Sequence, residues 1–132
     1  MTYESNRNTE KELGALLDSF FDYQPKRGTF ITDILADDAN IYVTSEASGL
    51  TNQDINVSYK DEILTISGER KTASINETAQ ALRKERSVGP FERKFAVGEV
   101  DFDSAKAKIE NGLLKIVLPK AENQKPKQLK IK

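Results

Sequence analysis

The chain has 132 residues, 37% of them hydrophobic and 31% charged, which predicts one domain of ordinary size with polar ends. Its net charge of −1 provides no overall field that attracts nucleic acid or an anionic membrane surface. The sequence contains no Cys and no His, which excludes disulfides and thiolate metal sites and removes the commonest general base near neutral pH. No apolar run approaches the roughly 20 residues of a membrane span, and no signal peptide opens the chain. We therefore expect a soluble, cytoplasmic protein with no cofactor, no metal and no stable membrane association.

Residues 1–30 differ in composition from the rest of the chain. Apolar side chains recur there at helical spacing after a capping-box pattern of Thr9 and Glu12, and Pro25 ends the pattern. These side chains, the N-terminal stripe, are Leu13, Leu16, Leu17, Phe20 and Phe21. A helix this short is marginal on its own, so its apolar stripe needs a partner. Two interpretations stay open: a helix packed on the core of its own domain, and an apolar face that binds other chains.

From Thr32 onward the hydrophobic pattern changes to a period of two, which is typical of half-buried strands. Alternation over residues 41–47 predicts one strand, closed by Ser48-Gly49, and alternation over residues 55–60 predicts the next. A short turn leads to a strand from residue 64, and Gly68 is expected to end this run. Because these connections are short, we expect antiparallel neighbours.

Residues 69–87 carry few apolar groups and show no periodicity. A connection of this length inside a compact domain indicates a functional or a disordered segment. Gly89-Pro90 is expected to form a turn before a further strand at residues 91–97. Arg93 shares a face of this strand with two phenylalanines, so we expect it near a sheet or dimer boundary, paired with a carboxylate. The alternative is an arginine exposed at an edge.

The strongest local signal is Asn111-Gly112 between two apolar runs, because a type I′ hairpin turn needs positive φ at both central residues. After the turn, apolar residues alternate along one face of the expected strand, and the opposite face is also partly apolar. The first set is Leu114, Ile116 and Leu118, and the second is Leu113 and Val117. A strand that is apolar on both faces must be covered on both, so the sequence predicts a second contact there.

The end of the chain is a charged linker, residues 121–128, followed by Leu129-Lys130-Ile131-Lys132. Leu129 and Ile131 point the same way from an extended segment, and two exposed apolar side chains on a polar tail favour docking elsewhere. A nucleic-acid tail is the weaker interpretation, because no aromatic residue interleaves the lysines between 120 and 132.

Four motifs, in order, resemble the small heat-shock protein family, which is built around the α-crystallin domain. They are L-T-I-S-G-E-R at 64–70, E-R-S-V-G-P-F-E-R-K-F at 85–95, A-x-x-x-N-G-x-L at 107–114 with Leu118-Pro119-Lys120, and Leu129-Lys130-Ile131 for I-x-I. The resemblance covers about residues 31–132 and points to the bacterial and plant branch. The chain departs from the family pattern at Ser48-Gly49, usually Pro-Gly, and at Val97-Gly98, usually Leu-Pro.

The resemblance implies an all-β fold, an immunoglobulin-like antiparallel β-sandwich over residues 31–120. It implies a partly helical or disordered arm at 1–30, a strand-swapping loop at about 71–88 and a tail at 121–132. The loop would carry a strand, about residues 81–86, that pairs with a neighbour's sheet in a homodimer. The implied dimer interface is Leu82, Arg83, Lys84, Glu85, Arg86 and Arg93. Leu129 and Ile131 would enter a groove of another dimer and build a larger homo-oligomer. The implied groove residues are Ile55, Val57, Leu113 and Leu114.

The same resemblance implies an ATP-independent holdase chaperone that binds unfolding client proteins and prevents their aggregation. Clients would meet the N-terminal stripe and the unoccupied groove, since apolar burial is not directional. No nucleotide-binding motif occurs in the sequence. The main alternative is a monomeric co-chaperone or adaptor of the CS type, which shares the sandwich but normally lacks the long loop and the tail motif. A carboxylate-pair hydrolase using Asp33, Asp37 or Asp38 has little support without His or Cys, so we expect no enzyme.

Overall fold

The computed structural model describes residues 30–131. This part of the chain contains seven strands and two short 3₁₀ helices. The strands are β1 (Thr32–Ala36), β2 (Asn40–Glu46), β3 (Ile55–Lys60), β4 (Ile63–Arg70), β5 (Gly89–Ala96), β6 (Lys106–Glu110) and β7 (Leu113–Pro119). The 3₁₀ helices are η1 (Phe102–Ser104) and η2 (Glu122–Gln124).

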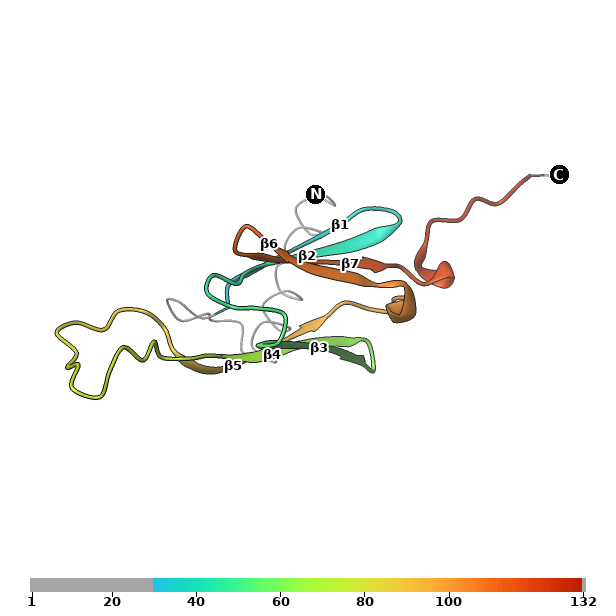
Figure 1. The fold of residues 1–132 in the computed structure, drawn as a ribbon. Coiled ribbons are helices and arrows are strands. Elements are labelled where there is room, and N and C mark those ends of the chain that lie inside the picture. Colours follow the sequence, from blue (N-terminus) through green and yellow to red (C-terminus); the bar gives the residue numbers. More distant parts are fainter. Residues whose placement is uncertain (1–29, 132) are drawn as a thin grey trace, which may run out of the picture.

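The strands form two sheets that face each other as layers (Figure 1). One sheet has the order β1-β2-β7-β6 and the other the order β3-β4-β5, and every pairing is antiparallel. The predicted antiparallel β-sandwich is therefore confirmed. The long loop and the C-terminal tail leave the sandwich at opposite ends (Figure 1).

The core lies between the sheets and follows from the alternation in the sequence. On β7 the inward side chains Leu114, Ile116 and Leu118 are at most 3% exposed, while the residues between them are half-buried. From the other layer, Leu64 and Ile66 are fully buried against them. A residue period of two thus places one face of each strand in the core, as the sequence predicts.

Two tight hairpins have the same turn geometry and different sequences. Asn111 and Gly112 have φ of +53° and +76°, which confirms the expected type I′-like turn between β6 and β7. Asp61 and Glu62 have φ of +52° and +66° between β3 and β4. The second turn has no glycine and carries the steric cost of left-handed backbone at two ordinary residues.

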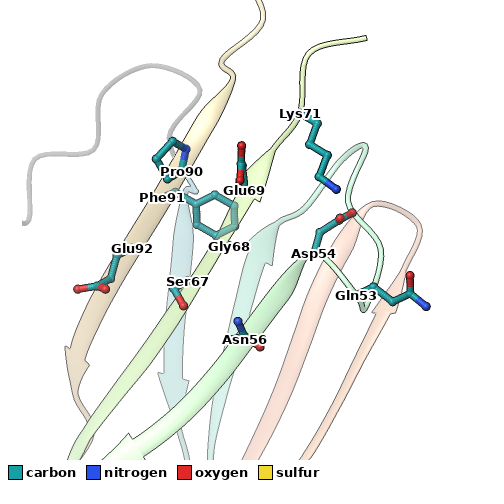
Figure 2. A pocket seen from close by; sticks show the side chains of 10 residues that line it. All are labelled: Gln53, Asp54, Asn56, Ser67, Gly68, Glu69, Lys71, Pro90, Phe91 and Glu92. Atoms are coloured by element: carbon teal, nitrogen blue, oxygen red, sulfur yellow. The ribbon is translucent and has the colours of Figure 1, made fainter. Parts of the chain in front are cut away.

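Gly68, Gly89 and Pro90, at β4 and β5, do not have the roles that the sequence predicted for them. β4 does not end at Gly68 but continues to Arg70, and Gly89 and Pro90 pair with its last residues as the start of β5. A proline is tolerated there because β5 is an edge strand and needs no N–H on its outer side. Gly68 instead leaves room for the Asp54 backbone and the Phe91 ring, which lie against it. A Cβ atom on it would clash with the carbonyl oxygen of Asp54 and lie 2.8 Å from Cζ of Phe91. Figure 2 shows the Phe91 ring beside this glycine.

Candidate interaction surfaces

Of the carboxylates proposed for the enzyme alternative, Asp33 lies on β1, and Asp37 and Asp38 lie at the turn between β1 and β2. Asp37 accepts hydrogen bonds from the Tyr42 hydroxyl at 2.7 Å and from the N–H groups of Asn40 and Ala39 at 2.7 and 2.9 Å. These bonds, with that of Tyr42 the largest contribution, hold the pKa of Asp37 below its ordinary value. Asp37 therefore stabilises a turn as an ionised group. Within residues 30–131, no group of three or more Asp and Glu side chains is arranged to hold a metal ion.

One candidate surface is the outer edge of β1. β1 ends the four-stranded sheet, so its second row of backbone groups has no strand partner within the described chain. Leu35 on this strand is 70% exposed, and Ile34 and Ile31 are also exposed. The sequence does not distinguish this strand from the turn that follows, because acidic residues interrupt its apolar pattern. An unpaired edge with exposed apolar side chains is a site where another strand can add.

The loop at residues 71–88 is the second candidate surface. It contains no strand, and Leu82 is 99% exposed. Arg83 and Glu85 form an ion pair at 3.1 Å that is open to solvent. The predicted interface residues Leu82 through Arg86 thus all lie together on this exposed loop. Arg93 does not lie with them, because its side chain is buried on β5.

Arg93 instead covers one side of the sandwich, where β5 faces the start of β1. Its Nη1 donates to the carbonyl oxygen of Phe30 at 2.9 Å, across the two sheets. Phe30 stacks on Phe91 with ring centroids 4.5 Å apart, and the Arg70 guanidinium lies about 6 Å from both rings. Phe30 is fully buried. The expected carboxylate partner of Arg93 is thus replaced, in this contact, by a backbone carbonyl.

The opposite side of the sandwich, between β3 and β6, is less completely covered. Tyr59 stacks on Phe102 just before β6 and donates its hydroxyl to the Gly98 carbonyl at 2.6 Å. This contact joins β3 to the segment that precedes β6. Further along, apolar side chains of both strands are half-buried or exposed. They are Ile55 and Val57 on β3 and Ala107 and Ile109 on β6.

The predicted groove residues are therefore only partly brought together. Ile55 and Val57 lie at the β3–β6 side, as the prediction requires. Leu114 is 3% exposed in the core, and Leu113 lies on the opposite face of β7. β7 is an inner strand, and β6 lies outside it in the sheet. A groove on this side would thus be bordered by β6 and not by Leu113 and Leu114.

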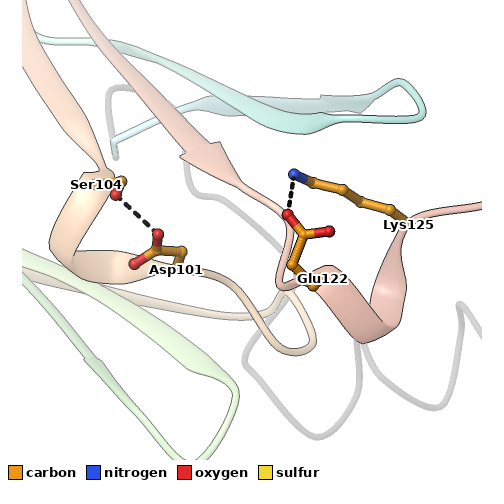
Figure 3. Close-up of polar contacts among 4 residues, drawn as sticks. All are labelled: Asp101, Ser104, Glu122 and Lys125. Carbon is orange, nitrogen blue, oxygen red and sulfur yellow. Dashed lines mark hydrogen bonds and ion pairs between the residues drawn. The ribbon is translucent and has the colours of Figure 1, made fainter.

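The C-terminal tail starts from a fixed position. Ala121 N–H donates to the Glu99 carbonyl, and the Asn123 side-chain amide donates to the Glu99 carboxylate at 2.6 Å. Lys125 pairs with Glu122 at 3.0 Å across η2, and Asp101 similarly accepts a bond from Ser104 across η1 (Figure 3). Beyond η2 the tail runs away from the sandwich (Figure 1). Leu129 and Ile131 are 93% and 97% exposed on it.

The predicted client-binding residues Leu13, Leu16, Leu17, Phe20 and Phe21 lie outside the described residues. Within the described part of the chain, no helix is long and apolar enough to cross a membrane. The large exposed apolar side chains of the described residues lie at the β1 edge, on the loop and on the tail.

Comparison with known proteins points to one family. Residues 33–132 match the Hsp20/alpha crystallin family model. The chain is 36% identical over 98 residues to heat shock protein HSP.16.4 of Streptococcus thermophilus, covering 73% of this chain and 69% of that protein. It is 32% identical over 128 residues to heat shock protein 16 of Schizosaccharomyces pombe, covering 89% and 90%. It spans less than two thirds of some plant relatives, such as 59% of an 18.1 kDa class I heat shock protein of Medicago sativa.

Solved structures agree with the sequence matches. Heat shock protein 16.0 from Schizosaccharomyces pombe superposes with a TM-score of 0.66 at 31% identity, covering 79% of this chain and 98% of that chain. A small heat-shock protein from Xylella fastidiosa, described as having a distinct high order structure, gives 0.63 at 31% identity, covering 79% and 96%.

Proposed function

The chain belongs to the Hsp20/alpha crystallin family, and on this premise we propose that it is an ATP-independent holdase. In this function it binds unfolding client proteins in the cytoplasm and prevents their aggregation, without catalysis and without a cofactor. The observation that carries the proposal is the distribution of apolar side chains. The sandwich has a complete core, yet Leu82, Leu129 and Ile131 are each more than 90% exposed. Such side chains favour contacts with further chains.

Pairing of the loop with a neighbour's β1 edge would make the dimer. A strand at about residues 81–86 would add to the unpaired side of β1 and cover Leu35. Main-chain hydrogen bonds would provide affinity, and Leu82 would find a buried position that the single chain does not offer. The CS-type alternative explains neither an exposed loop of this length nor the tail motif.

Docking of the tail would join dimers into a larger oligomer. Burial of Leu129 and Ile131 at the β3–β6 side contributes at most ~3–6 kcal/mol, taking ~1.5–3 for each large side chain. Ordering the tail costs about 1–2 kcal/mol for each residue in backbone entropy. Binding of one tail is therefore weak and reversible. Several tails bound at once hold the assembly, because each bound tail keeps the others at a high effective concentration near their grooves. Exchange of tails would uncover apolar surface for clients, together with the N-terminal stripe.

The test is native mass by light scattering, with suppression of client aggregation measured on the same samples. Leu129→Ala/Ile131→Ala is compared with the intact chain and with Gln128→Ala/Lys130→Ala, which changes the alternate positions of the same tail. We expect the intact chain and the control to form large oligomers and the first variant to fall to dimers. An intact chain that is monomeric would contradict the loop-swapped dimer and favour the CS-type adaptor. Assembly without any protection of clients would contradict the holdase.

A further inference from the structure

The outer edge of β1 (Figure 1) offers backbone groups to a further strand at alternate residues only. The Ile31 carbonyl accepts a hydrogen bond from the Glu46 N–H at 2.9 Å, next to the start of the β1–β2 ladder. Hydrogen-bonded pairs alternate along an antiparallel ladder, so the odd-numbered residues of β1 direct their backbone groups to β2. Thr32, Ile34 and Ala36 therefore direct theirs to the outer edge.

The side chains of β1 also differ between its two faces. Ile34 lies opposite the buried Val43 and faces the other layer, while Asp33 and Leu35 face outward. Within residues 30–131 the Asp33 side chain makes no hydrogen bond or ion pair. β1 and β2 contain no basic residue, and the nearest cation in the cross-strand row of Asp33 is Lys115 on β7, two strands away. Asp33 is thus an exposed carboxylate on an unpaired edge.

The loop segment at residues 81–86 has side chains that match this edge. In an extended conformation Leu82 and Lys84 fall on one face, and Arg83 and Glu85 fall on the other. Arg83 and Glu85 form an ion pair in the single chain at 3.1 Å, with 80% and 71% of their side chains exposed. The segment contains no proline, so each of its residues can donate to a ladder.

Two antiparallel registers would place a cation of a second copy opposite Asp33, and they differ by one residue. Such a slip exchanges the two faces of the added strand. In the register with Lys84 opposite Asp33, Arg83 and Glu85 turn toward the inner layer. Two charged groups would then leave water at the edge of the core, which is costly even for an ion pair.

The register with Arg83 opposite Asp33 leaves fewer charges inside. Leu82 then lies opposite Ile34, which is 39% exposed in the single chain, so both apolar side chains gain cover. Lys84 is the one charged residue of the segment that faces inward beside β1. It lies at the start of the strand, where its long stem can carry the ammonium group to solvent.

The other charges near this edge do not reverse the preference. Glu46 is the only charged residue of β1 and β2 besides Asp33. Glu85 of the second copy would enter the row of Glu46 two strands away, at about 9–10 Å, where salt screens most of the repulsion. Arg83 would lie between Glu85 and Asp33, and Arg86 follows beyond the end of β1.

We propose that the loop of a second copy adds to β1 as an antiparallel strand with Arg83 opposite Asp33. Leu82 then lies opposite Ile34, and a parallel strand that kept this apolar pair would move Arg83 away from the carboxylate. Since Ile34 directs its backbone groups to the added strand, Asp33 and Arg83 form a non-hydrogen-bonded pair, in which opposed side chains come closest. The pairing rests on the proposed loop-swapped dimer and adds the direction, the register and the ion pair that select it.

Because the chain has no cysteine, introduced cysteines can report the register in full-length chains that carry Leu129→Ala/Ile131→Ala. A chain with Leu35→Cys is refolded together with a chain that carries Ala81→Cys, opposite Leu35 in the proposed register, or Leu82→Cys, opposite it in the slipped one. A disulfide needs Cα atoms within about 7 Å and Cβ atoms that face each other. We expect covalent dimers with Ala81→Cys and few with Leu82→Cys. Equal yields, or a higher yield with Leu82→Cys, would overturn the proposal.

Charge exchange tests the ion pair through the dissociation constant of the dimer. Asp33→Arg should raise this constant roughly tenfold, because like charges then oppose each other at both copies of the contact in a two-fold dimer. Adding Arg83→Asp should restore the constant, and adding Lys84→Asp should not. Asp38→Arg, the same change just beyond β1, is the matched control and should alter the constant by less than about twofold. Restoration by Lys84→Asp instead, or equal effects of Asp33→Arg and Asp38→Arg, would overturn the proposal.

Native mass separates failure of the register from failure of the dimer. A parent chain that is dimeric but gives no disulfide between residues 35 and 81 would overturn the register and leave the loop-swapped dimer in place. A monomeric parent chain would overturn both.

Discussion

Two regions of the molecule contain the same type of apolar side chain, leucine, but bury it in one region and expose it in the other. In the sandwich, formed by β1 to β7, Leu118 is fully buried between the layers. In the open segments, which are the loop at 71–88 and the tail beyond η2, Leu82 and Leu129 are more than 90% exposed. Both regions belong to one short chain, so composition alone does not separate them.

The difference shows which contacts one chain completes by itself. The sandwich buries its core through pairings within the chain, and an aromatic stack lies at each of its two sides. The open segments lack a second layer to pack against, so their apolar side chains gain nothing until another chain is present. Substitutions in the sandwich should therefore change folding, and substitutions in the open segments should change assembly.

The largest effect is expected from a leucine of the sandwich. Leu118→Ala removes a fully buried side chain and should lower the free energy of unfolding by about 2–5 kcal/mol. The same change at the exposed Leu129 should alter that free energy by no more than about 0.5 kcal/mol. Denaturant unfolding at low protein concentration measures both. Equal losses at the two sites would break the comparison, because Leu129 would then belong to the folding core.

A glycine inside the sandwich tests how tightly the layers are packed. Gly68→Ala places a Cβ atom against the backbone oxygen of Asp54 and the ring of Phe91. Since backbone must move, we expect a loss of about 1–3 kcal/mol in the free energy of unfolding. Gly98→Ala isolates the other cause of a glycine requirement: its Cβ meets no atom within 4 Å, so a loss there comes from its φ of +76°. An unchanged free energy of unfolding for Gly68→Ala would show that crowding does not require glycine at residue 68.

Much of the sandwich could be predicted because its signals are local. The Asn111-Gly112 turn fixes both φ angles through residue type, and alternation along β7 fixes which side chains face inward. Neither inference needs to know which strands are neighbours. The turn at Asp61 and Glu62 shows the limit of this logic, because the same geometry there depends on the pairing of β3 with β4 and not on a glycine.

The rest depends on contacts between distant parts of the chain. Pro90 looks like a turn residue in sequence but is accommodated because β5 lies at a sheet edge. The groove prediction names Leu113 and Leu114 on β7 and not the neighbouring β6 for a similar reason, since spacing along the chain does not tell which strand lies outside β7. Phe30 gave no sequence signal at all, and its burial comes from Phe91 and Arg93. The predicted contacts of Leu82, Leu129 and Ile131 require a second chain, so they stay predictions.

The smallest effect is expected from Asp37→Asn, which tests whether hydrogen bonds in the β1–β2 turn stabilise the sandwich. Tyr42, Asn40 and Ala39 hydrogen-bond the Asp37 carboxylate and hold its pKa below the ordinary 3.8. A lowered folded pKa means that the contribution is fully present above pH 3.8 and is lost as the pH falls through the folded value. Asp37→Asn should therefore lower the thermal midpoint most at neutral pH, and the gap to the parent chain should close in acid. Asp38→Asn, at the exposed neighbouring position, should leave the midpoint unchanged. A gap for Asp37→Asn that is constant with pH would mean that the turn needs the shape of this side chain and not its charge.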